Sequence, residues 1–215
     1  MARGLGPRGR RLGMGMFNRL VTPVGTEVLL VSGNEERARV MEAMLIEQGF
    51  GLAGVISEPA NIAAKVAQSK AQVIVVNADK VDPPLIAALG KIPADARRPT
   101  VLFCEDATTE GIHAAVAAGV NAYVVVGLGG NRIRAAIDMA EANYQNTRQL
   151  RDELDEAREA LKARKVIERA KGLIMKEKGL DEAAAYQLLR SRAMQKGQRL
   201  VDVATTITEA AEVMK

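Results

Sequence analysis

The stretch "QVIVVNA" at residues 72–78 decides the fold, because it is the most continuous β-branched run in the chain. Its apolar residues follow one another without the polar alternation of a half-exposed strand. Strands of this kind are buried on both faces and are typical of parallel sheets covered by helices on both sides. We therefore expect residues 72–78 to form the central strand of such a sheet.

The segments around this run alternate between strand-like and helix-like patterns. Strand-like runs occupy residues 27–32, 51–57, 99–105 and 121–127, and helical periodicity appears at 35–49, 59–69, 83–91, 109–119 and from 131 onward. In the first helix, the residues at helical spacing are Ala38, Met41, Leu45 and Ile46. Five alternations predict an α/β fold with a doubly wound parallel sheet. The simplest strand order is the flavodoxin-like 2-1-3-4-5.

This alternation resembles the receiver domain of bacterial response regulators over about residues 27–142. The resemblance implies an acidic pair after the first strand, a phosphoacceptor Asp after the third, a hydroxyl after the fourth and a Lys after the fifth. In this chain the corresponding positions hold Ser32, Gly33, Asn77, Cys104 and Val126. An amide cannot accept a phosphoryl group in this way, and Ser and Gly cannot hold Mg²⁺. Residues 26–142 are thus expected to form a degenerate pseudo-receiver domain used for dimerisation or docking.

An acceptor moved to a nearby position is the alternative for this domain. Asp79, Glu105 and Asp106 follow the third and fourth strands and could form a relocated phosphorylation site. That alternative would make the chain a phosphorylation-responsive two-component regulator.

The composition narrows the remaining function classes. Aromatic residues make up 3% of the chain, which weakens any proposal based on base stacking across a sheet. One cysteine and one histidine exclude an internal disulfide and a His-rich metal site, and we expect no cofactor and no catalytic site. The single cysteine favours a reducing, cytoplasmic compartment, and no apolar run is long enough for a membrane span.

The N-terminal segment differs from the rest of the chain. Residues 1–19 carry five arginines and no acid, and the segment is rich in glycine without periodicity. We expect residues 1–25 to be a disordered tail, with a weak nucleic-acid contact as the functional alternative.

A long helix is expected after the sheet. No Gly or Pro occurs between Asn131 and Gly172. Leu150, Leu154, Ala157 and Leu161 recur at steps of four, three and four, which is a heptad seam. Residues 143–163 are therefore predicted to be a coiled-coil linker that forms a parallel homodimer, and the alternative is a solitary solvated helix.

The C-terminal segment, residues 164–215, is predicted to be a small three-helix bundle. Its helices are separated by Gly179 and Gly197, and Asp181 is placed as an N-cap. Between residues 164 and 199 the chain holds ten basic residues and four acidic ones. Such a local excess of positive charge indicates a surface for a polyanion, although a solvated helical surface would show it too.

The stretch "KVIERAKGLIMKEKGLDEAAAYQLLRSRAMQKGQRLVDVATTI" at residues 165–207 resembles the ANTAR domain of bacterial transcription antiterminators. The resemblance is carried by "IERAKGLIM", by "AYQLLR" and "RAM", and by "LVDVA". It implies binding of paired stem-loops in leader mRNA, which prevents a terminator hairpin from forming. The nitrate/nitrite-assimilation type is the most similar, and it implies a ligand-sensing regulatory protein that sequesters the antiterminator.

The resemblance and the charge together select the expected RNA contacts, which are Lys171, Arg190 and Arg199, with Arg169, Gly172, Lys176, Arg192 and Lys196 in support. Ala170 or Met194 could touch a loop base, and Tyr186 could stack on a base or belong to the core. Two bundles on one coiled coil would engage two stem-loops. The rival interpretation is a protein-interaction module without RNA binding. DNA binding is a weaker rival, because no helix-turn-helix recognition segment is evident.

Overall fold

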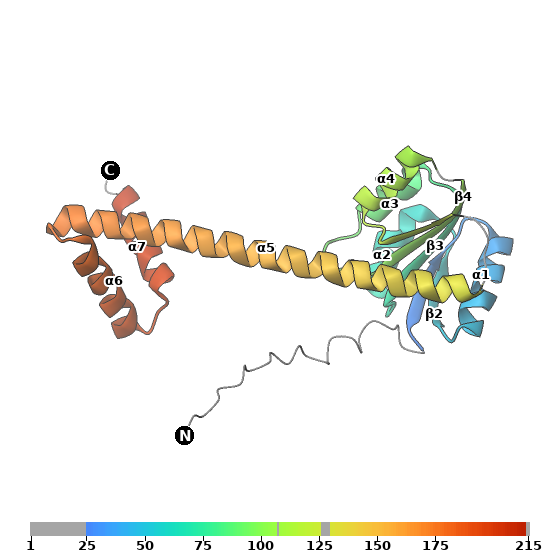
Figure 1. Ribbon diagram of the computed structural model, residues 1–215, viewed down its shortest axis with the longest axis horizontal. Coiled ribbons are helices and arrows are strands. Elements are labelled where there is room, and N and C mark those ends of the chain that lie inside the picture. The colour runs from blue at the N-terminus through green and yellow to red at the C-terminus, as the bar shows by residue number, and fades with distance from the viewer. Residues whose placement is uncertain (1–24, 107, 126–129, 214–215) are drawn as a thin grey trace, which may run out of the picture. The chain divides into compact units, whose positions relative to one another are not determined.

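The computed structural model describes residues 25–106, 108–125 and 130–213 (Figure 1). Within it the chain forms two compact units, Met1–Thr147 and Arg148–Lys215. The expected tail, apart from Gly25, and the position of Val126 lie outside the described residues.

The first unit is built on a five-stranded parallel sheet. Its strands are β1 (Glu27–Val31), β2 (Gly51–Ile56), β3 (Val73–Lys80), β4 (Thr100–Asp106) and β5 (Ala122–Val125). They are arranged in the order β2-β1-β3-β4-β5, and every neighbouring pair is parallel. The flavodoxin-like order expected from the sequence is thus confirmed. The expected central strand is confirmed as β3, which continues two residues beyond the predicted end.

Helices cover both faces of the sheet (Figure 1). One face packs against α1 (Glu35–Glu47) and the start of α5 (Gly130–Lys178). The other face packs against α2 (Ile62–Gln68), preceded by the 3-10 turn η2 (Pro59–Asn61), and against α3 (Pro83–Gly90) and α4 (Thr109–Ala118). Alternate residues of β3 enter the two cores, so both faces of this strand are apolar as its sequence requires.

One residue of the predicted inner face of α1 lies elsewhere. Ala38, Met41 and Leu45 are buried, but Ile46 is 60% exposed. One helical residue turns the chain by about 100°, so Ile46 points away from the stripe that ends at Leu45. Ile46, which the helical spacing grouped with the other three residues, thus lies outside the core.

The helix α5 is continuous over 49 residues and passes through Gly172 without a break. The predicted divisions of the chain at residues 142 and 163 both fall inside it. Its last turns belong to the second unit, together with α6 (Glu182–Lys196) and α7 (Leu200–Val213).

The second unit is a three-helix bundle with a small aliphatic core. The buried core residues are Ala170, Ile174, Ala185, Leu189, Ala193, Val203 and Ala204. Asp181 is the N-cap of α6, as expected, and its side chain accepts a hydrogen bond of 2.7 Å from the Ala184 backbone N–H. Gly179 and Gly197 both have positive φ, so the two turns of the bundle use left-handed backbone that favours glycine.

Candidate functional site

The outer surface of α6 carries unpaired positive charge. Arg190, Arg192 and Lys196 are exposed, and within the described part of the chain none of them has an ion-pair partner. Lys176, near the end of α5, is exposed and unpaired in the same sense. These four predicted RNA contacts are therefore open to an external anion.

Two large side chains lie on the same face of α6 as Arg190. Met194 is 73% exposed and Tyr186 is 38% exposed, although both are apolar enough for a core. Tyr186, Arg190 and Met194 are spaced four residues apart, which places them along one helical stripe. We call Tyr186, Arg190 and Met194 the outer stripe of α6. The structure thus resolves the ambiguity at Tyr186 in favour of a surface position.

Two other predicted contacts already have carboxylate partners. Arg169 forms an ion pair of 2.8 Å with Glu212, which ties α5 to α7. Arg199 makes a bidentate contact with Asp202, with Nε and Nη2 at 2.9 and 2.8 Å from the two carboxylate oxygens. That contact raises the pKa of Arg199 and lowers the pKa of Asp202, chiefly through the hydrogen bonds. An RNA phosphate would have to share these cations with the protein.

Lys171, the first of the expected contacts, lies between α5 and α6. Its side chain is 9% exposed, and its ammonium is 2.6 Å from Glu182 and 2.9 Å from Glu168. The hydrogen bond to Glu182 is the main cause that raises the pKa of Lys171, and it lowers the pKa of Glu182. In this conformation Lys171 presents no open charge, because two carboxylates occupy its donors. Ala170, suggested as a base contact, is fully buried, and that suggestion was wrong.

Gly172 has no structural reason to be glycine in the described structure. It lies inside α5, is exposed, and does not have a positive φ. A Cβ placed on it would meet no atom within 4 Å. The backbone is therefore bare at this point of the helix surface, and an external molecule could approach it closely.

The predicted coiled-coil seam is an exposed apolar line on α5. Leu150, Leu154 and Leu161 are 58%, 48% and 55% exposed, and Ala157 is exposed with them. Ion pairs within the helix flank the seam, between Arg158 and Asp155 and between Lys162 and Glu159. Exposed leucines at heptad spacing are the surface that a second helix would cover.

The four pseudo-receiver positions that the structure describes lie at the carboxyl ends of the strands. Ser32 and Asn77 are buried, and with Gly33 they line a cavity of about 210 Å³ beside β1 and β3. Cys104 is buried on the other face of the sheet, and its Sγ is 3.4 Å from the Asp79 carbonyl oxygen, to which it donates. No group of three or more His, Cys, Asp and Glu residues in the described part of the chain is placed to hold a metal ion.

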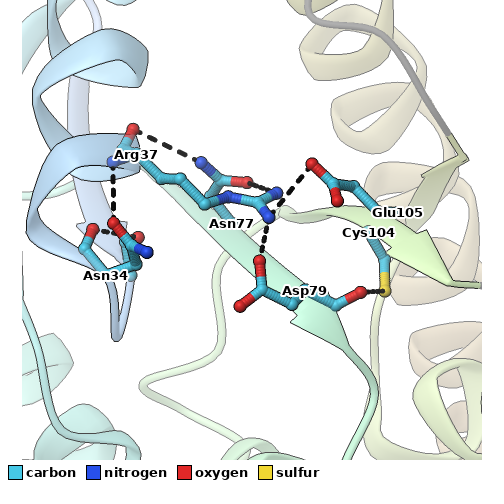
Figure 2. A network of polar contacts seen from close by, with 7 residues as sticks. Asn34, Arg37, Asn77, Asp79, Cys104 and Glu105 are labelled. Carbon is cyan, nitrogen blue, oxygen red and sulfur yellow. Dashed lines mark hydrogen bonds and ion pairs between the residues drawn. The ribbon is translucent and has the colours of Figure 1, made fainter.

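The most connected polar side chain at this edge was not predicted. Arg37 of α1 reaches across the strand ends to Asn77, Asp79 and Glu105 (Figure 2). Its only sequence signal was a basic residue in the first turn of a helix, where the macrodipole disfavours positive charge.

Comparison with known proteins assigns the second unit. Residues 155–207 match the ANTAR domain family. The chain contains an ANTAR domain. A transcriptional regulatory protein, PdtaR from Mycobacterium tuberculosis, is 25% identical over 187 residues, which cover 86% of this chain and 88% of PdtaR. A nitrate regulatory protein from Klebsiella oxytoca is 42% identical over 59 residues, which cover 27% of this chain and 15% of that protein.

Solved structures resemble the first unit in fold alone. A pilus assembly-related protein from Burkholderia pseudomallei superposes with a TM-score of 0.51 and 17% identity, over 57% of this chain and 95% of that one. A signal receiver domain from Desulfovibrio desulfuricans gives a TM-score of 0.49 and 15% identity, over 56% of this chain and 97% of that one. The protein with the ANTAR domain thus also has a flavodoxin-like unit, as its strand order shows. In the described residues no helix meets the length and apolarity of a membrane span.

Proposed function

We propose that this ANTAR-domain protein is a cytoplasmic, RNA-binding regulator that binds paired stem-loops in leader mRNA and prevents terminator formation. The observation that carries the proposal is the unpaired basic surface of α6, which lies inside the residues that match the ANTAR domain. The two relatives, a transcriptional regulatory protein and a nitrate regulatory protein, are consistent with a role in gene regulation.

The α6 surface suits a hairpin loop rather than a regular duplex. Arg190, Arg192 and Lys196 supply charge for phosphates without breaking any ion pair. Tyr186 and Met194 supply an aromatic ring and an apolar side chain beside Arg190, whereas Arg192 lies about 200° round the helix from Arg190. Unstacked loop bases are recognised by stacking and edge contacts, whereas the bases of an RNA duplex are poorly accessible. We therefore assign base contact to Tyr186 and Met194, and phosphate contact to Arg190, Arg192, Lys196 and Lys176.

The bare backbone at Gly172 provides the close approach in this arrangement. Helix α5 gives up a side chain there although none would clash. An RNA backbone that lies against this turn would explain the glycine. Lys171 keeps its place in the proposal as a positioning residue, which fixes the first turn of α6 through Glu182. Arg169 and Arg199 are assigned secondary contacts, because each is shared with a carboxylate.

The seam on α5 supports a homodimer. Leu150, Leu154, Ala157 and Leu161 would bury one another in a parallel pair of helices. A dimer would present two ANTAR domains to two stem-loops, and the second contact would be intramolecular.

The receiver-like unit is proposed to serve in docking or dimerisation without phosphorylation. Asn77 and the other replaced positions leave no acceptor at the expected point, and control would come from a partner. The resemblance to the nitrate type suggests a ligand-sensing protein that sequesters the antiterminator.

Selection from an RNA hairpin library with a randomised loop tests the proposal. The full chain is expected to enrich particular loop sequences, and the Arg190→Gln variant is expected to bind the winners at least tenfold more weakly. The matched control is Arg151→Gln, an exposed cation outside α6. Binding that is weak and indifferent to the loop sequence would favour the protein-interaction alternative.

A further inference from the structure

The carboxyl ends of β3 and β4 are bridged by one cation from α1. The Arg37 guanidinium donates from Nη2 to the Asn77 Oδ1 at 3.1 Å, and its Nη1 lies 3.1 Å from the Glu105 carboxylate. The same Nη1 forms an ion pair with Asp79. Figure 2 shows the guanidinium between these three side chains.

The backbone around Arg37 holds this side chain in place. The Arg37 N–H donates to the Asn34 Oδ1 at 3.1 Å, as part of the N-cap of α1. The Asn77 amide Nδ2 is 3.5 Å from the Arg37 carbonyl oxygen, to which it donates. Arg37 and Asn77 are therefore joined through both side chain and main chain, and the Arg37 side chain is 20% exposed.

Three oxygen-bearing groups that converge in this way are an ordinary ligand set for a hard cation. Mg²⁺ and Ca²⁺ bind carboxylate and amide oxygens, commonly at the ligand-binding edge of a parallel sheet. Here the Arg37 guanidinium occupies the position that such a cation would take. A guanidinium carries a fixed charge and donors in a planar fork, so it can satisfy several oxygens at once.

Removal of the guanidinium would leave a charged gap. Asp79 and Glu105 are 67% and 70% exposed, and they would then face each other without a counter-ion. Both carboxylates contact the same Nη1, so without it their like charges would repel each other and a hydrated cation could enter. The neighbouring cavity of about 210 Å³, which Arg37 also lines, offers room for the ion and its water.

We propose that Arg37 is a built-in replacement for a metal ion, which holds α1 to the ends of β3 and β4 and makes the receiver-like unit insensitive to divalent cations. The guanidinium permanently offsets one of the two negative charges of Asp79 and Glu105, so the unit has a single resting arrangement at this edge. A unit of this kind binds its partners through its surface, and that binding does not depend on a bound metal ion or a phosphoryl group. The proposal is independent of RNA binding.

The full-length chain and its Arg37→Met variant test this through the thermal midpoint of the receiver-like unit, with chelator or with millimolar Mn²⁺. The wild-type midpoint is expected to be the same in both. The Arg37→Met midpoint is expected to fall by about 4 °C or more with chelator, and Mn²⁺ is expected to restore at least half of the loss.

Arg39→Met is the matched control. Arg39 lies on the same helix and is exposed, and its one ion pair among the described residues is with Glu35 at 3.7 Å. This variant is expected to keep the wild-type midpoint and to ignore Mn²⁺.

Two results would overturn the proposal. One is a wild-type midpoint that rises with Mn²⁺ as much as that of Arg37→Met, and the other is an Arg37→Met chain that loses no stability and gains no response. If Arg37→Met is unfolded with and without Mn²⁺, Arg37→Lys decides. A folded, Mn²⁺-indifferent lysine variant supports the need for a cation, and an unfolded one shows that guanidinium packing matters and its charge does not.

Discussion

Neutralising the three unpaired cations of α6 should change the salt dependence of RNA binding by a predictable amount. The variant replaces Arg190, Arg192 and Lys196 with glutamine. Each phosphate contact by a cation contributes about 0.7 to 0.9 to the slope of log affinity against log salt, because it releases condensed counterions. None of the three has an intrachain ion pair in the described structure, so each contributes fully. The slope should become shallower by about 2 to 3.

The assay is fluorescence anisotropy with a single selected stem-loop, titrated at several salt concentrations. A single hairpin keeps the second ANTAR domain of a dimer from adding its own contacts. The control carries the same loss of charge on the exposed part of α5, as Arg151→Gln, Arg158→Gln and Lys162→Gln. Its slope should equal that of the wild type. Equal slopes for all three proteins would refute the assignment of the α6 surface, and equal losses in both variants would mean that only net charge matters.

Three further outcomes are expected. Leu154→Asp should halve the mass measured by sedimentation velocity, because it puts a charge in the proposed seam; an unchanged mass would place the dimer contact elsewhere or remove it. Glu182→Gln should flatten the fall in bundle stability as the pH drops below the ordinary carboxyl pKa of 4.5. The reason is that Lys171 lowers the pKa of Glu182 below the ordinary 4.5. The ion pair therefore stabilises the fold above pH 4.5, and this stabilisation is lost as the pH falls through the lowered pKa. Thermal melts of both proteins against pH would show the flatter curve of the variant, and parallel curves would contradict the prediction. Incubation with acetyl phosphate and Mg²⁺ should leave the intact mass unchanged, whereas a gain of about 80 Da, one phosphoryl group, would revive phosphorylation at Asp79 or a neighbour.

The parallel sheet and the long helix were predictable because their signals are local. A run such as residues 72–78 indicates a strand that is buried on both faces of a parallel sheet. The right-handed connections between parallel strands then leave few possible strand orders. The continuity of α5 follows from the absence of Gly and Pro before Gly172. The exposed Ile46 shows the limit of this reasoning, because residues adjacent in sequence can be equally apolar and still point 100° apart.

The state of individual charges was not predictable, because it depends on contacts between distant elements. Glu168 is one turn from Lys171 on the same helix, but Glu182 reaches it only because the turn at Gly179 folds α6 back on α5. Arg37 depends in the same way on the ends of two strands far along the chain. The sequence gives the number and spacing of the charges, but which of them form ion pairs depends on the fold.

Gly172 bears on any attempt to raise the thermal stability of this protein. Alanine at an exposed position inside a helix is favoured over glycine by about 1 kcal/mol, and the open space around Gly172 would admit it without a clash. A screen that rewards thermal resistance alone should therefore select Gly172→Ala. If RNA lies against this turn, the added methyl group would stand between the helix and the RNA. The screen would then raise thermal stability and lower RNA affinity. At position 172, helix stability thus favours alanine and RNA binding favours glycine, and the two residues differ by one methyl group.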